Sequence, residues 1–215
     1  MKKIPFLTLI IGTLALFVVV QNGSVEALEF SRTALARGQL WRLLTGHLTH
    51  FSADHLKWDL VVFLALGSLV ELRNRTHFTV SVVGGALLIS IGVWWLQPQF
   101  NNYRGLSGVD SALFGYLAAD IFKLARAEAK RWTAVAAGLA MALFAAKTLF
   151  ELNTGQTLFV ENTVSFSPVP LAHLIGVIVG GVAAFGDSLK NVMCFCFRTR
   201  AVVQILDRRC SERST

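Results

Sequence analysis

The chain has 215 residues, of which 54% are hydrophobic and only 15% are charged. Soluble globular domains carry about 25% charged residues, so this composition argues against a water-soluble domain and indicates a lipid bilayer as the surrounding solvent. A net charge of +7 is compatible with either nucleic acid or anionic lipid as a partner. The sequence has no basic face interleaved with aromatic residues, and we therefore expect no nucleic-acid partner.

Six apolar segments with few charges follow one another along the chain. A helix that spans a bilayer needs about 20 mainly apolar residues, and each segment is close to that length. The sequence therefore predicts an all-α membrane protein in which residues 1–190 form one six-span bundle. The predicted spans are 4–20, 56–72, 78–96, 107–123, 132–150 and 170–187.

The loop between the first two predicted spans, residues 21–54, is long and mixes apolar with basic residues. The run from Ala34 to Leu44 alternates such residues and contains Trp41. Amphipathic segments of this kind lie in the membrane interface, where tryptophan is enriched. We expect short amphipathic pieces at the outer leaflet.

Basic residues gather on one side of the predicted membrane, and this side is normally the cytoplasm. With a cytoplasmic N-terminus, that side holds most of the 20 basic residues. The sequence therefore predicts that both termini are cytoplasmic and that residues 191–215 form a basic cytoplasmic tail with reduced thiols. The basic residues on the predicted cytoplasmic side are Lys2, Lys3, Arg73, Arg75, Lys123, Arg126, Lys130, Arg131, Lys190, Arg198, Arg200, Arg208, Arg209 and Arg213.

Ser107 stands between glycines at the point where a loop enters the fourth predicted span, in the run Gly105-Leu106-Ser107-Gly108. Glycine permits unusual dihedrals and close backbone approach, and the free N–H groups at a helix start can bind an oxyanion. A helix-capping serine beside packing glycines is the structural alternative. The run alone does not decide between them.

Two glycine faces predict that the fourth and sixth spans pack closely. His173 shares a helix face with Gly176 and Gly180, at spacings of three and seven residues. Gly108 and Gly115 form a similar face on the fourth span. Small residues of this kind let neighbouring helices approach each other in a membrane.

Ser107 and His173 both lie near the outer ends of their predicted spans, so the sequence predicts a contact between them. A serine and a histidine are the minimum for nucleophilic catalysis, in which histidine takes the hydroxyl proton and later gives it to the leaving amine. His55 and Asp59, four residues apart at the same depth, share one helical face. An imidazole at that position can donate to a developing oxyanion.

The histidines of the first loop also raise the alternative of a metalloprotease. His47, His50 and His55 are close in sequence, but the chain contains no His-Glu-x-x-His string. We expect these side chains to be hydrogen-bonded or solvated and to bind no metal. His77, in a short turn on the cytoplasmic side, is also expected to be solvated.

Taken together, these residues resemble the motifs of the rhomboid family of intramembrane serine proteases. Each motif is modest alone, but their joint order, spacing and topology over residues 5–187 are highly specific. The motifs that carry the resemblance are Trp41-Arg42, His50-Phe51-Ser52-Ala53-Asp54-His55, Glu71 at the end of the second span, Gly105-Leu106-Ser107-Gly108, and Ala172-His173-Leu174-Ile175-Gly176.

The resemblance implies a catalytic dyad of Ser107 and His173 without a third acid. It implies an oxyanion site formed by the N–H groups of Leu106 and Ser107 and by His55, with Asp59 as a further candidate. Neither a metal nor an organic cofactor is implied. Substrates would be membrane-anchored proteins cut within or next to a transmembrane segment, at a site open to the periplasmic side of a bacterial inner membrane.

This sequence departs from the family pattern at two positions, Asp59 and Ser111. Family members usually have asparagine where this chain has Asp59, and bacterial members often have tyrosine where it has Ser111. Asp110 is unusual within a span and receives no role. The pair Trp58-Asp59 and the compact form resemble the rhombosortase branch, which implies processing of C-terminal sorting tails on exported proteins.

Two other functions remain open at the level of sequence. A non-catalytic rhomboid-fold protein that binds membrane clients would use the same bundle, although such relatives typically lack the serine or the histidine. A transporter would use Asp59, Asp110 and His173 as a proton or ion path. The discontinuous helices and inverted repeats that mark many transporters are not evident.

Overall fold

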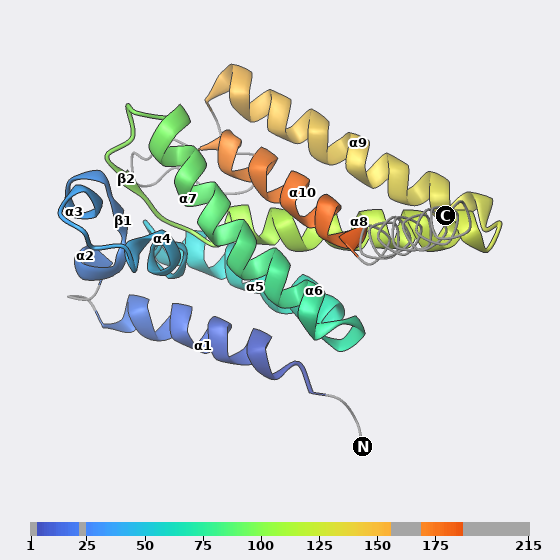
Figure 1. Ribbon diagram of the computed structural model, residues 1–215, viewed down its shortest axis with the longest axis horizontal. Helices are drawn as coiled ribbons and strands as arrows, with labels where there is room; N and C mark the ends of the chain where they lie inside the picture. The colour runs from blue at the N-terminus through green and yellow to red at the C-terminus, as the bar shows by residue number, and fades with distance from the viewer. Residues whose placement is uncertain (1–3, 22–24, 156–168, 187–215) are drawn as a thin grey trace, which may run out of the picture.

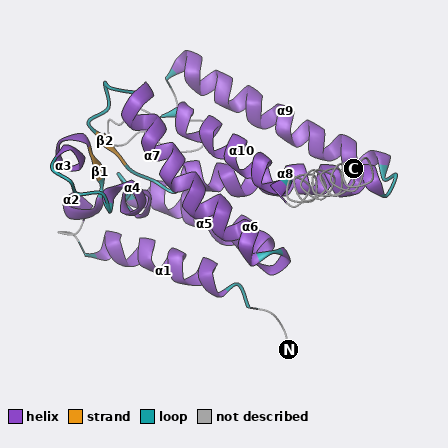
Figure 2. Ribbon diagram, viewed as in Figure 1, coloured by secondary structure: helices purple, strands orange, loops and turns teal. Residues whose placement is uncertain are grey.

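The computed structural model describes residues 4–21, 25–155 and 169–186. Helices dominate this part of the chain, which also contains two short strands (Figure 2). The third predicted span is one continuous helix that begins as α6 (Arg75–Thr79), passes through a π-helical turn, η2 (Val80–Gly84), and continues as α7 (Gly85–Leu96). The other long helices are α1 (Phe6–Val20), α5 (Ala53–Arg73), α8 (Ser107–Ala127), α9 (Arg131–Thr154) and α10 (Pro170–Ala184).

Each long helix coincides with a predicted span to within a few residues, which supports the all-α assignment. By length and composition, Arg75–Leu96 and Arg131–Thr154 are able to cross a membrane, while α1 and α10 are apolar but shorter. The number of spans and the side on which the described ends lie therefore stay predictions. The tail 191–215 lies outside the described residues.

Capping residues explain where two helices begin. Ser52 precedes α5 and its side chain accepts a hydrogen bond from the His55 backbone N–H, at 3.1 Å. Asn74 precedes α6 and accepts in the same way from the His77 N–H, also at 3.1 Å. Each side chain supplies an acceptor for an amide that has no carbonyl partner in the first turn.

Helix α8 occupies the centre of the bundle and contacts α5, α7, α9 and α10. Figure 1 shows α10 between α7 and α9, with the first turns of α8 and α10 directed toward the end of the molecule that carries the short elements. Helix α1 packs along α5. This arrangement brings the start of α8 and the start of α10 to the same end of the bundle.

The contact between α8 and α10 is made by backbone against backbone. A methyl group on Gly176 would overlap the carbonyl oxygen of Gly108, and one on Gly180 would overlap the carbonyl oxygen of Ala112. From the other side, a methyl group on Gly115 would overlap the backbone of Val177. The two glycine faces therefore meet, and no side chain larger than hydrogen fits between the helices at these points.

A buried carboxylate attaches α1 to the end of α5. Glu71, 2% exposed, accepts hydrogen bonds from the Leu7 N–H at 3.0 Å, the Thr8 N–H at 2.8 Å and the Thr8 hydroxyl at 2.9 Å. These two amides belong to the first turn of α1, where backbone donors lack partners within the helix. The acidic residue that closes the second predicted span thus has a structural explanation.

The loop 21–54 contains short helical pieces, as the sequence predicts. They are gathered with a two-stranded antiparallel sheet at one end of the bundle (Figure 1), where Phe30 pairs with Tyr103. Trp41 is 53% exposed, and its position in the membrane interface stays a prediction. The short elements are α2 (Val25–Leu28), β1 (Phe30–Ser31), α3 (Arg32–Ala36), α4 (Arg42–Thr45), the 3₁₀ turn η1 (Gly46–Leu48) and β2 (Asn102–Tyr103).

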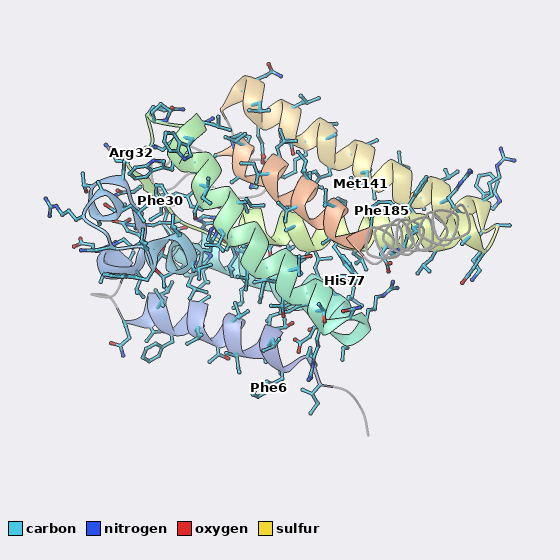
Figure 3. The ribbon with its side chains drawn as sticks, in the orientation of Figure 1. Phe6, Phe30, Arg32, His77, Met141 and Phe185 are labelled. Carbon is cyan, nitrogen blue, oxygen red and sulfur yellow. The ribbon has the colours of Figure 1, made fainter. Side chains whose placement is uncertain are left out.

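Two arginines fasten these elements to one another and to α7. Arg32, labelled in Figure 3, donates to the carbonyls of Trp94 at 2.8 Å and Gln97 at 3.1 Å, at the C-terminal end of α7. Arg42 is buried and donates to the carbonyl of Glu29 at 2.7 Å. Helix ends and loops leave carbonyls without intrahelical partners, and a guanidinium with several donors satisfies more than one of them.

The expectation that His77 is solvated is wrong. The side chain is buried and its Nδ1 lies 3.1 Å from the hydroxyl of Tyr116 on α8. Figure 3 shows His77 on the continuous helix that runs into α7. Asn74 alone separates α5 from α6, and the contact with Tyr116 places the His77 ring against α8.

The glycine contact gives a first prediction. Gly180→Ala should lower the free energy of unfolding by about 1–3 kcal/mol, the usual cost of forcing an atom into a packed contact. Gly181→Ala is the matched control, because a Cβ there meets nothing within 4 Å. Thermal unfolding in detergent micelles compares the two variants with the parent chain. Equal melting temperatures for both variants would contradict the backbone contact.

Candidate active site

Ser107 is the first residue of α8 and follows a glycine in a left-handed conformation. Gly105 has φ +122°, a value that side chains rarely adopt. A Cβ on Gly105 would lie 2.9 Å from His55 Cε1 and 3.2 Å from Asp59 Oδ2. Glycine is therefore required at this position by both the backbone and the space. The turn delivers Ser107 to the start of the helix, beside the buried Leu106.

The structure brings Ser107 and His173 together. Ser107 Oγ lies 3.1 Å from His173 Nε2, across the contact between α8 and α10. This distance is within hydrogen-bonding range. Both residues are half-buried, and the His173 side chain keeps 12% of its surface exposed. The hydroxyl and the imidazole thus have the geometry that a nucleophile and its general base require.

A carboxylate contacts the second ring nitrogen of His173, although the family resemblance implied no third acid. His173 Nδ1 lies 3.2 Å from Glu151 Oε2 on α9, and Lys147 Nζ donates to Glu151 Oε1 at 2.7 Å. The sequence analysis missed Glu151. Two opposite charges four residues apart in an otherwise apolar helix were the available signal, because charged residues within a span need a partner or a role.

Asp59 connects α5 to the backbone of the candidate nucleophile. Its Oδ2 accepts a hydrogen bond from the Ser107 N–H at 3.1 Å. The same oxygen lies 3.2 Å from His50 Nε2 and 3.3 Å from His55 Nε2. All of these groups except Ser107 are buried. The predicted cluster of His55 and Asp59 is therefore adjacent to Ser107, with the carboxylate placed between the rings and the amide.

The hydrogen-bonding partners of His47 lie outside the cluster of Asp59, His50 and His55. Burial lowers the pKa of His47 from 6.5 to about 4, so the ring is neutral near pH 7. Its Nε2 lies 3.0 Å from the Ala86 carbonyl and 3.1 Å from Ser90 Oγ. Within the described residues, no three His, Cys, Asp or Glu side chains are arranged to hold a metal ion.

Ser111 and Asp110 line the inner side of the first turns of α8. Ser111 Oγ donates to the Ser107 carbonyl at 2.7 Å, and a Cβ on Gly176 would lie 3.1 Å from Ser111 Cβ. A small residue here allows α10 to pass close to α8. Asp110 is buried beneath the site, and no contact connects it to Ser107 or His173 among the interactions described.

The carboxylate of Asp59 gives a second prediction. Asp59→Ala should lower the free energy of unfolding by about 3 kcal/mol, because the Ser107 N–H loses its acceptor and two buried rings lose their nearby carboxylate. Asp59→Asn keeps an acceptor oxygen of similar position and should retain most of the stability. Melting temperatures of the two variants and the parent chain in detergent micelles test this prediction. An alanine variant with the same melting temperature as the parent chain would show that Asp59 does not stabilise the fold.

Comparison with known proteins adds evidence independent of the geometry. The family model described as the Rhomboid domain matches residues 37–190, which include Ser107, His173, His55 and Asp59. The chain is 31% identical over 116 residues to the rhomboid protease GlpG of Pectobacterium atrosepticum, which is 52% of this chain and 41% of that protein. It is 29% identical over 119 residues to GlpG of an Enterobacter species, covering 52% and 42% of the two chains.

A third bacterial relative gives a similar match. The chain is 30% identical over 91 residues to YdcA of Bacillus subtilis, a provisionally named rhomboid protease, covering 41% of this chain and 46% of YdcA. The chain thus spans less than half of the length of these relatives. The region matched by the family model, residues 37–190, contains the candidate site.

Proposed function

Because the chain belongs to the rhomboid family and is an integral membrane protein, we propose that it is an intramembrane serine endopeptidase. Its substrates are membrane-anchored proteins, cut within or next to a transmembrane segment. The observation that carries the proposal is the 3.1 Å separation between Ser107 Oγ and His173 Nε2. A hydroxyl in contact with an imidazole, at a half-buried position with some access to water, is the arrangement that acyl transfer needs.

The proposed reaction has two steps. Ser107 Oγ attacks the scissile carbonyl while His173 Nε2 takes the hydroxyl proton, and the collapse of the tetrahedral adduct breaks the C–N bond as His173 protonates the leaving amine. Water then attacks the acyl-enzyme, with His173 again acting first as base and then as acid. The products are a new carboxylate and the free serine hydroxyl.

We assign the oxyanion to the N–H groups of Leu106 and Ser107 and to His55. The start of α8 supplies amides without intrahelical partners, and the His55 ring lies beside Gly105, the residue that precedes Leu106. Asp59 holds this set in place, because its Oδ2 contacts the Ser107 N–H and the rings of His50 and His55. A carboxylate cannot donate to an oxyanion unless it is protonated, so Asp59 supports the donors and is not itself one of them.

The proposal includes a six-span topology with both termini in the cytoplasm and the site open to the periplasmic side of a bacterial inner membrane. The distribution of basic residues supports this orientation. The position of the site supports it as well, because Ser107 begins α8 and His173 lies in the first turn of α10, both toward the end of the bundle that carries α2, α3 and α4 (Figure 1).

For the substrate class, we propose C-terminal sorting tails of exported proteins, in the manner of the rhombosortase branch. The support is the resemblance of Trp58-Asp59, which begins three residues after His55, to that branch. Asp59 contacts the nucleophile's own amide, so the residue that suggests the branch is part of the site. A non-catalytic binding protein of the same fold is the alternative that the next experiment decides.

Ser107→Ala should abolish cleavage of a membrane-anchored reporter while leaving the melting temperature of the purified chain unchanged. The reason is that alanine removes the nucleophile and leaves the contacts of the Ser107 N–H intact. Labelling with a fluorescent alkyl fluorophosphonate provides a readout that needs no substrate, and the parent chain should be labelled while the variant is not. A parent chain that is neither labelled nor able to cleave would indicate the non-catalytic binder.

The topology is tested through the three native cysteines, Cys194, Cys196 and Cys210. A membrane-impermeant maleimide should label them in permeabilised bacteria and leave them unlabelled in intact cells with a permeable outer membrane, because the tail is proposed to be cytoplasmic. Ala36→Cys in a cysteine-free background is the control for the opposite side, since Ala36 is exposed on α3. Labelling of the native cysteines in intact cells would reverse the orientation.

A further inference from the structure

We infer that Glu151 is a positioning residue for His173, so that the site operates as a Ser107–His173–Glu151 array. The inference rests on the proposed function, because it concerns the base of that reaction. It assigns a third acid to a site for which the sequence implied a serine and a histidine alone. The three side chains come from α8, α10 and α9, respectively.

The contacts of the His173 ring determine which of its nitrogens carries the proton. The two ring nitrogens of His173 face different partners, with Nε2 3.1 Å from Ser107 Oγ and Nδ1 3.2 Å from Glu151 Oε2. A carboxylate accepts and does not donate, so the proton of the neutral ring resides on Nδ1. Nε2 is then left with its lone pair directed at the serine hydroxyl, which is the tautomer that a general base requires.

The Glu151 carboxylate is buried and is paired with a cation. The Glu151 side chain is 2% exposed, and its other oxygen accepts from Lys147 Nζ at 2.7 Å. Removing a charge from water is expensive unless the charge is paired. Lys147 lies one turn earlier on the same helix and supplies that pairing, so the carboxylate stays ionised beside the imidazole. Both oxygens of Glu151 therefore have partners.

Ionisation gives the carboxylate a role in the reaction as well as in the fold. When His173 takes the serine proton, it becomes an imidazolium that lies next to the Glu151 carboxylate. The charge-assisted hydrogen bond stabilises this cation more than the neutral ring. The effect appears only as the transition state is approached, so it should raise the rate constant of the chemical step rather than the affinity for the substrate.

The test uses the purified full chain in phospholipid vesicles and the rate of inactivation by an alkyl fluorophosphonate. In that reaction the Ser107 Oγ–P bond forms, the P–F bond breaks and fluoride leaves, while His173 accepts the hydroxyl proton. Glu151→Gln should reduce the maximal rate constant of inactivation about 10- to 100-fold, the usual contribution of a hydrogen bond to a charged group. The probe concentration at half-maximal rate should change little.

The pH profile separates positioning from a structural role. The acidic limb of the inactivation rate should move to lower pH in Glu151→Gln, because the imidazolium loses the adjacent negative charge, and Glu151→Asp should restore part of the rate. Glu128→Gln is the matched control, since Glu128 is exposed and pairs with Lys130 on the surface. Within the described residues, the titratable groups around His173 are Glu151 and Lys147 on α9, the buried Asp110 on α8 and, beyond Ser107, Asp59 with His50 and His55.

The possible outcomes are distinct. An unchanged rate constant and pH profile in Glu151→Gln, with or without a lower melting temperature, would overturn the inference and leave the proposed protease intact. A parent chain that does not react with the fluorophosphonate at all would overturn the proposed function and, with it, the role of Glu151. A reduced rate with a displaced acidic limb and partial restoration by Glu151→Asp establishes the role.

Discussion

At Gly176 and Gly180 the backbone of α10 lies directly against the carbonyl groups of α8. Lipid tails are as apolar as the helices, so association within a bilayer depends on close van der Waals contact rather than on the hydrophobic effect. His173 stands one turn before Gly176, and Ser107 stands one residue before Gly108. The distance between hydroxyl and imidazole is therefore a direct result of how near the two backbones come.

Carboxylates fix the remaining helices at both ends of the bundle. Glu71 accepts from the first turn of α1, Asp59 from the first residue of α8, and Glu151 contacts α10 through His173. An unpaired polar group in an apolar environment costs free energy, so each of these contacts selects one rotation and one depth for the helix it joins. The glycines set how close the helices come, and the carboxylates set their alignment.

Helix periodicity explains which parts of this arrangement could be predicted from the sequence. Spacings of three, four and seven residues place His173 with Gly176 and His55 with Asp59, whatever the neighbours are. Periodicity does not say which helix a face meets. The contacts of Glu151 with α10 and of His77 with α8 depend on that choice. This is why His77, which was expected to be solvated, is found to be buried. Periodicity also does not predict that the Asp59 carboxylate accepts a hydrogen bond from the Ser107 amide in addition to its contacts with the histidine rings.

The amide of Ser107 already has an acceptor, because Asp59 Oδ2 lies 3.1 Å from its nitrogen. One N–H group directs one strong hydrogen bond at a time, so an oxyanion that uses this donor has to displace a carboxylate oxygen. Neutral acceptors, such as water or an unreactive carbonyl, compete poorly with a negative charge. A developing oxyanion competes on equal terms. In the proposed reaction, this exchange of partners would favour the transition state over the bound ground state, and the selectivity would come from the resting contact between Asp59 and the Ser107 amide.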